Sequence, residues 1–137
     1  MRVLGVDPGL TRCGLAVVDA QMGQRGKLIH LEVAQSDAKL DPAERLFQIA
    51  ERIDFVMDRF KPEAVSLERL FAQQNLRTVM GVAQISGVVL LAARKRNITA
   101  VTYTPTAVKA AVTGHGRSDK KQVANMVKTL LNLTEIP

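Results

Sequence analysis

The first part of the chain contains three short apolar runs that alternate with polar positions. The runs are RVLGV, CGLAVVD and KLIHLEVAQ, and their β-branched residues are typical of strands. The connection between the first two contains Pro8-Gly9, a pair that favours a turn. Three consecutive strands on short connections predict an antiparallel meander over residues 2–35.

The segment DPAERLFQIAERIDFVMDRF has a helical pattern instead. Asp41 is placed as the N-cap, Pro42 suits the first helical position, and Glu44 lies three residues after the cap. Apolar residues then recur every three or four positions, which predicts one buried helix face. These residues are Leu46, Ile49, Ala50, Ile53, Val56, Met57 and Phe60. The pair Lys61-Pro62 is expected to end the helix.

The second half alternates strands and helices. EAVSLERLF is short, apolar and bounded, which predicts a buried strand with Glu68 near its carboxyl end. LRTVMGVAQISGVVLLAARKR predicts a long helix in which Gly81 and Gly87 allow close packing, and ITAVTY predicts a fifth strand. TPTAVKAAV predicts a short helix that starts on Thr104-Pro105, and Ser118 is expected to cap a last helix. The apolar stripe of that last helix includes Val123, Val127, Leu130 and Leu131.

The element order βββ-α-β-α-β-α predicts an α/β fold. Three antiparallel strands followed by alternating helices and strands form a mixed five-stranded sheet with helices on both faces. No linker-like stretch or internal repeat interrupts the pattern, so residues 1–137 are expected to form a single domain. Asp7 ends the first strand and Glu68 lies in the fourth. If these strands are neighbours, their carboxylates stand a few ångströms apart.

Composition narrows the class of protein. The apolar stretch at the N-terminus is only a few residues long and contains Asp7, so it predicts neither a signal peptide nor a membrane span. We therefore expect a soluble cytoplasmic protein without a membrane partner. Cys13 is the only cysteine and lies in a strand-like run, where a small buried hydrophobe is the expected role.

The positive charge is concentrated in the second half of the chain. The formal net charge is +6, which favours an acidic partner such as nucleic acid. Seven cations between Arg94 and Lys121 face a single acid, Asp119. The cations of residues 94–96 are explained equally well as helix-end charges that the helix dipole favours.

Two adjacent carboxylates repel each other unless a proton, a side-chain cation or a metal neutralises them. Oxygen ligands suit Mg²⁺ or Mn²⁺, and such ions activate water and stabilise the leaving oxygen in phosphodiester hydrolysis. Asp7 and Glu68 therefore outline a metal site for a nuclease. An aspartate before Pro-Gly is also a common turn residue that bonds its own backbone, and this interpretation of Asp7 stays open. A glutamate flanked by AVSL would be costly to bury without a partner.

Three motifs carry a resemblance to a known family. GVDPGLTRCG, LERLF with QQN following, and TPTAVKAAVTGHGRSDKKQV together resemble the RuvC family of Holliday junction resolvases, retroviral-integrase-like members of the RNase H-like fold. The similarity runs from Arg2 to about Leu131 and, with three motifs in the same order and spacing, is specific. It implies a metal-dependent endonuclease that resolves four-way DNA junctions by symmetric paired nicks during recombination and repair.

The resemblance also implies roles for single residues. Asp7 and Glu68 match the first two acids of the family's Mg²⁺ or Mn²⁺ site, where they are catalytic ligands. Phe71 matches an aromatic residue that stacks on unpaired bases at the junction. The other implied DNA-binding residues are Asn75, Arg77, Lys109 and Lys120. A homodimer and a branch-migration motor complex are further partners that only the resemblance implies.

The sequence departs from the family pattern after LLNLTEIP. The resemblance places the remaining metal ligands in a last helix beyond this segment, so residues 1–137 carry two of four expected ligands. We therefore expect a single nuclease domain without that helix, with weak metal binding and little nuclease activity.

Two alternatives stay open, and a third is remote. In the first, the chain is a junction-binding module that does not cut in this form. In the second, it is a YqgF-type RNase H-like nuclease. More remotely, Asp7-x-Gly9-x-Thr11-x-x-Gly14 resembles the first phosphate loop of actin-like ATPases and sugar kinases. That class also needs a second phosphate loop and an adenosine loop, for which 137 residues leave no room.

Overall fold

The computed structural model describes residues 1–21, 23–69, 75–104, 114, 119–131 and 133–135. Its elements are β1 (Arg2–Asp7), β2 (Arg12–Asp19), β3 (Lys27–Gln35), α1 (Pro42–Phe60), β4 (Ala64–Glu68), α2 (Leu76–Lys95), β5 (Thr99–Tyr103) and α4 (Lys120–Leu130). The predicted helix that starts on Thr104-Pro105 falls on residues 105–113, outside the described residues.

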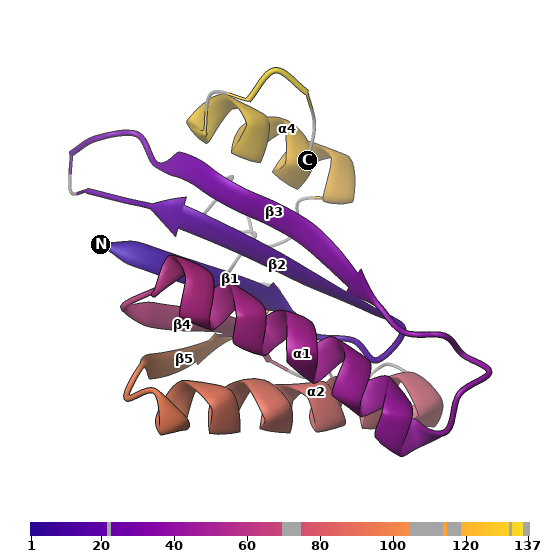
Figure 1. The fold of residues 1–137 in the computed structure, drawn as a ribbon. Coiled ribbons are helices and arrows are strands. Elements are labelled where there is room, and N and C mark those ends of the chain that lie inside the picture. Colours follow the sequence, from indigo (N-terminus) through magenta and orange to yellow (C-terminus); the bar gives the residue numbers. More distant parts are fainter. Residues whose placement is uncertain (22, 70–74, 105–113, 115–118, 132, 136–137) are drawn as a thin grey trace.

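The five strands form one mixed sheet in the order β3-β2-β1-β4-β5 (Figure 1). β1, β2 and β3 pair antiparallel, which confirms the predicted meander. β4 pairs parallel with β1 on one side and with β5 on the other. The carboxyl ends of β1, β4 and β5 therefore meet at one edge of the sheet.

One face of this sheet forms the core against α1 and α2. Leu4, Val6, Leu15 and Val17 alternate along β1 and β2 and are almost fully buried, as the period-two pattern predicts. The strands also contribute the core residues Cys13, Ala34, Val65 and Leu67, and the helices contribute Ile49, Ile53, Val56, Met57, Ile85, Val89, Ala92 and Ala93. α4 lies on the side of β3 away from α1 (Figure 1), and a Cβ atom on Gly26 would be 3.1 Å from Leu131 at its end.

The ends of α1 form as predicted. The Asp41 side chain accepts a hydrogen bond from the Glu44 amide at 2.9 Å, and Pro42 occupies the first turn. At the other end Lys61 adopts a left-handed conformation with φ 50°, and its amide donates to the Met57 carbonyl at 3.0 Å. Pro62 follows and prevents continuation of the helix.

Two sequence expectations about helix details were wrong. The N-cap of α4 is Asp119, not Ser118. The Asp119 side chain accepts from the Gln122 amide and the Gln122 side chain accepts from the Asp119 amide, both at 2.8 Å, so this reciprocal capping box satisfies two amides. Gly81 does pack closely, because an added Cβ would be 3.1 Å from the Leu10 Cβ. Gly87 does not pack closely within the described part of the chain, since none of its atoms lies within 4 Å of a Cβ atom added there.

The outer face of α2 is unusually apolar. By length and composition α2 is the one helix among the described residues that would be long enough to cross a membrane, with a mean hydropathy of 1.6. Ile85 and Val89 belong to the core, so we interpret α2 as a core helix. Its exposed residues Leu76, Met80, Gly87, Leu90 and Leu91 recur at helical spacing along one side.

Candidate active site

Asp7 and Glu68 lie side by side at the carboxyl edge of the sheet. Val6 pairs with Leu67 in the parallel ladder between β1 and β4, and each acid is the next residue on its strand. Neighbouring strands are about 4.8 Å apart. Because side chains alternate along a strand, neither acid points into the core, which Val6 and Leu67 face. The pairing of β1 with β4, on which the expected proximity of the two acids depends, is therefore confirmed.

Backbone pairing fixes both strand ends. Asp7 pairs with Gly14 of β2, and the missing side chain at Gly14 leaves the space beside the Asp7 carboxylate uncovered on that side. Beyond Glu68, the Arg69 amide donates a hydrogen bond to the carbonyl of Tyr103. The ladder thus continues one residue past Glu68 and holds the end of β4 in place.

The turn after Asp7 is tightly packed. A Cβ atom at Gly9 would overlap the carbonyl oxygen of Arg12, so only glycine fits there. On the outside of the turn, Leu10 rests against Gly81 of α2. The sequence motif DPGLTR therefore specifies a compact turn. A larger residue at Gly9 in the turn, or at Gly81 in α2, would displace it.

A hydrogen-bond network ties the same turn to α1. The Ser36 hydroxyl donates to the Leu10 carbonyl, and the Ser36 amide donates to the Thr11 carbonyl at 3.2 Å. Arg45 Nε donates to Ser36 Oγ at 3.1 Å, and Arg45 Nη2 donates to Thr11 Oγ1 at 2.9 Å. Ser36 is only 8% exposed. This network fixes the turn from the side opposite α2.

A groove of about 470 Å³ opens between this turn and the start of α2. Asp7 lies at its wall, and three arginines, Arg12, Arg45 and Arg77, also line it. Sequence reasoning named Asp7 and Arg77 and missed the other two. Arg12 could have been found from the sequence, because it is a cation inside the DPGLTR motif. Arg45 could not, because nothing in the pattern of the helix distinguishes it from other solvent-side residues.

Asp7 takes part in none of the ion pairs found among the described residues. The described residues also contain no group of three or more His, Cys, Asp or Glu side chains placed to hold a metal. Asp7 and Glu68 are thus a pair of oxygen donors, which suits a hard divalent cation that keeps water in its remaining positions.

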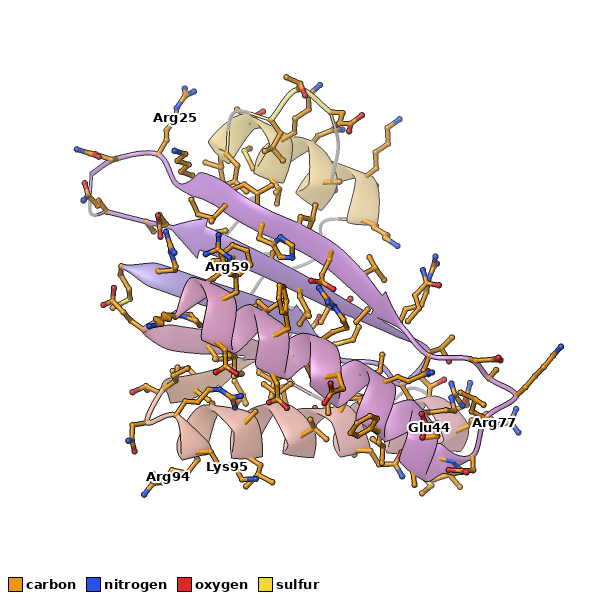
Figure 2. All side chains as sticks on the ribbon, in the orientation of Figure 1. Arg25, Glu44, Arg59, Arg77, Arg94 and Lys95 are labelled. Atoms are coloured by element: carbon orange, nitrogen blue, oxygen red, sulfur yellow. The ribbon has the colours of Figure 1, made fainter. Side chains whose placement is uncertain are left out.

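The predicted DNA-binding residues fall in different places. Asn75 is the N-cap of α2, and its side chain accepts from the Thr78 amide at 3.0 Å. Arg77 follows in the first turn and is exposed near the carboxyl edge (Figure 2). Lys120 is exposed at the start of α4. Phe71 and Lys109 lie outside the described residues.

Among the cations near the end of α2, Arg96 has a structural role. It donates to Asp58 at 2.8 and 3.1 Å and forms an ion pair with Asp54 at 3.0 Å, which links α2 to α1. The Arg96 side chain holds the pKa of Asp58 below its usual value through these hydrogen bonds. For this residue the helix-end interpretation is the better one.

Cys13 is the buried residue that the sequence predicts. It is fully buried beside the turn, and desolvation raises the pKa of its thiol to about 11. The thiol is therefore protonated at neutral pH and has no nucleophilic role.

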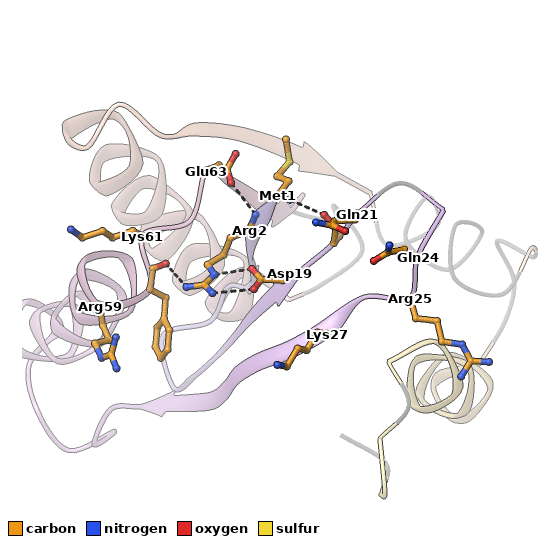
Figure 3. A pocket seen from close by; sticks show the side chains of 12 residues that line it. Met1, Arg2, Asp19, Gln21, Gln24, Arg25, Lys27, Arg59, Lys61 and Glu63 are labelled. Carbon is orange, nitrogen blue, oxygen red and sulfur yellow. Dashed lines mark hydrogen bonds and ion pairs between the residues drawn. The ribbon is translucent and has the colours of Figure 1, made fainter.

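A second hollow of about 620 Å³ lies at the opposite end of the sheet (Figure 3). Arg2 and Asp19 meet there in a bidentate pair at 2.8 and 3.0 Å, and Arg2 also donates to the Phe60 carbonyl at 3.0 Å. Other cations on its rim are Arg25, Lys27, Arg59 and Lys61. Asp7 and Glu68 lie at the other edge, so this hollow is separate from the candidate site.

Comparison with known proteins identifies the family. The family model of the crossover junction endodeoxyribonuclease RuvC matches residues 3–137. The chain belongs to the RuvC family. A RuvC from Frankia casuarinae is 53% identical over 137 residues, which are 100% of this chain and 80% of that protein. This match decides against the YqgF-type and actin-like alternatives.

Solved structures of the RuvC family have the same fold. T. thermophilus RuvC in complex with a Holliday junction substrate superposes with a TM-score of 0.93 at 37% identity, over 100% of this chain and 83% of that chain. The yeast mitochondrial Holliday junction resolvase has a TM-score of 0.66 at 17% identity, over 96% of this chain and 63% of that one, and supports the fold alone. The RNase H-like α/β class expected from the sequence is confirmed.

Proposed function

We propose that this RuvC family member is an endonuclease that resolves Holliday junctions, with Asp7 and Glu68 as its catalytic metal ligands. Family membership supports the reaction. The single observation that supports the site is the pairing of β1 with β4, because these neighbouring strands end in Asp7 and Glu68 next to a groove lined with arginines. We further propose that residues 1–137 act as one nuclease domain in the cytoplasm.

The residues present fit a divalent ion of the Mg²⁺ or Mn²⁺ type. When bound, such an ion activates water and stabilises charge on a phosphodiester. Asp7 would hold it from a strand end that two backbone ladders and the packed turn fix, so the carboxylate needs little reorganisation. Glu68 would hold it from the neighbouring strand. With two acids in place among the described residues, we expect metal binding to be weak.

Of the proposed DNA contacts, Arg77 lines the groove beside Asp7. Arg77 and Lys120 are exposed cations that would neutralise phosphates. Asn75 is exposed at the start of α2, where the backbone amides and the helix dipole favour anions. From the resemblance we also propose Lys109 near the cleaved phosphate and Phe71 as the residue that stacks on bases.

We propose the apolar face of α2 as the homodimer surface. Leu76 is 77% exposed, and Met80 and Leu91 are more than half exposed on the same helix. At Gly87 in the middle of this stripe, an added Cβ would meet no atom, which leaves room for a second helix to approach closely. A two-fold dimer matches a four-way junction that is cut at two symmetric positions. A motor complex as partner stays a proposal from the resemblance alone.

A cleavage assay tests the function. The chain is incubated with a labelled four-way junction or a matched linear duplex, in Mg²⁺ or in EDTA. Because metal binding is expected to be weak, we expect slow paired nicks on the junction that need a high Mg²⁺ concentration and disappear in Asp7→Asn and Glu68→Gln. Junction-selective binding without nicks at any metal concentration would favour the non-cleaving binding module instead. No preference for the junction would contradict the proposal.

A further inference from the structure

The groove beside Asp7 contains more positive charge than the catalytic proposal uses. Three arginines and one aspartate line it. Arg12 and Arg77 take part in no ion pair among the described residues, and both are exposed. Like charges around one groove repel one another, so an anion between them is stabilised.

Arg45 differs from the other two because its position is fixed. Its Nε and Nη2 donate to Ser36 and Thr11 at 3.1 and 2.9 Å. Ser36 is itself almost buried and bonded to the turn. A guanidinium group has five N–H donors, so three of them are left for a ligand in the groove.

A fixed guanidinium group suits a phosphate. Its planar fork presents parallel N–H groups to two phosphate oxygens. Since Arg45 is already held in place, binding costs less side-chain entropy than it would for a free surface arginine. Three arginines outnumber the single carboxylate in the groove, and a DNA strand that reaches Asp7 brings a further phosphate beside them.

We propose that Arg45, together with Arg12 and Arg77, forms a subsite for a DNA phosphate next to the one that is cut. This proposal rests on the proposed function, because the DNA strand must reach Asp7 to enter the groove. Arg45 also acts as a positioning residue, since the same hydrogen bonds hold the turn that follows Asp7. Phosphate binding and turn position are thereby coupled in one side chain.

The test measures junction binding in EDTA, so that no cleavage interferes. Arg45→Ala is expected to weaken binding about tenfold and to reduce the slope of log affinity against log salt by about one. Arg45→Lys keeps the charge but lacks the planar guanidinium group, and it should bind better than Arg45→Ala but less tightly than the unmodified protein. Thr11→Ala keeps every charge but removes one of the two hydrogen bonds that fix Arg45, and we expect it to weaken binding less than Arg45→Ala. Arg25→Ala, at the opposite end of the sheet, is the matched control.

A chemical change in the DNA makes the test specific. Single phosphates near the cut are replaced, one at a time, by neutral methylphosphonates. At one position the unmodified protein should lose about tenfold in affinity, while Arg45→Ala loses nothing further. This non-additivity would not arise from a folding defect, which lowers affinity at every position alike.

Three outcomes would overturn the proposal. The first is equal binding by Arg45→Ala and the unmodified protein, and the second is an equal loss in Arg45→Ala and Arg25→Ala. The third is a methylphosphonate effect that is independent of Arg45 at all positions. If the unmodified protein does not bind the junction, the proposed function fails together with the subsite, which distinguishes this result from the other three.

Discussion

Each end of the sheet has an aspartate close to arginines, but only one of the two aspartates forms an ion pair among the described residues. At the amino end of β1, Asp19 is held by Arg2 through two hydrogen bonds, which lower the pKa of the aspartate and raise that of the arginine. At the carboxyl end, Asp7 lies beside three arginines and pairs with none of the described residues. Both ends are hollow and rich in cations. The difference shows that a carboxylate is available for a ligand only where the chain itself does not neutralise it.

The largest expected effect separates the two aspartates. Asp7→Asn should lower junction cleavage at least about 100-fold, the loss typical when one electrostatic stabiliser of a transition state is removed. Its melting temperature should stay the same or rise, since no internal partner is lost. Asp19→Asn should do the opposite: cleavage is kept and the melting temperature falls slightly. Cleavage rates and thermal unfolding of both variants check this. A loss of cleavage in Asp19→Asn would break the comparison.

A second prediction concerns a paired carboxylate within the sheet. Glu32 accepts from Arg52 at 2.8 and 2.9 Å, and these hydrogen bonds, assisted by His30, hold its pKa below the usual value. Ionised Glu32 therefore stabilises the folded protein fully at pH values above the unfolded pKa of about 4.3. This stabilisation is lost as the pH falls through the lowered pKa that Glu32 has in the folded state. Glu32→Gln should cost about 1–3 kcal/mol at pH 7.

Urea unfolding of Glu32→Gln and the unmodified protein from pH 7 to pH 3 measures this difference. We expect the two unfolding free energies to converge as the pH falls below about 4. A difference that is independent of pH would show that the paired state of Glu32 is not what stabilises the sheet.

The smallest expected effect tests how α2 supports the carboxyl end. Gly81→Ala places a methyl group 3.1 Å from Leu10 and should cost about 1–3 kcal/mol from overpacking, offset by up to about 1 kcal/mol from the better helix former. It should also lower cleavage, because the turn after Asp7 shifts.

Gly87→Ala is the control in the same helix. Its position is open, so the monomer should gain about 0.5–1 kcal/mol, while dimer formation should weaken if the proposed surface is correct. Thermal unfolding and analytical ultracentrifugation of both variants provide the readouts. Equal stability changes in the two variants would contradict the role of Gly81 in the turn.

Most of the fold follows from local sequence signals. Periodicity predicts each described strand and long helix, and Asp41, Pro42 and Lys61 mark the ends of α1 where the structure has them. The prediction was wrong where two neighbouring residues, Ser118 and Asp119, are both suited to be the N-cap of α4. The N-cap is the residue whose side chain accepts a hydrogen bond from the amide three residues later, and this residue is Asp119. The packing of Gly81 and Gly87 likewise depends on the tertiary neighbour of each residue.

The candidate site was only partly accessible from the sequence. Glu68 stands out because a carboxylate in an apolar run is costly to bury without a partner, and Asp7 stands out by its place between two apolar runs in the motif shared with the family. Arg45 does not stand out, since its role arises from Ser36 and Thr11, which reach it only when the loop after β3 and the turn after β1 meet. Such a contact has no periodic signature.

The parallel pairing of β1 with β4 has a consequence for how the site comes into being. β2, β3 and α1 separate the two strands along the chain, so Asp7 and Glu68 meet only after a large loop has closed. Long-range pairings of this kind form slowly, because loop entropy is lost before the contacts compensate it. Partly folded chains and nascent chains that end before β4 therefore lack the candidate pair of carboxylates.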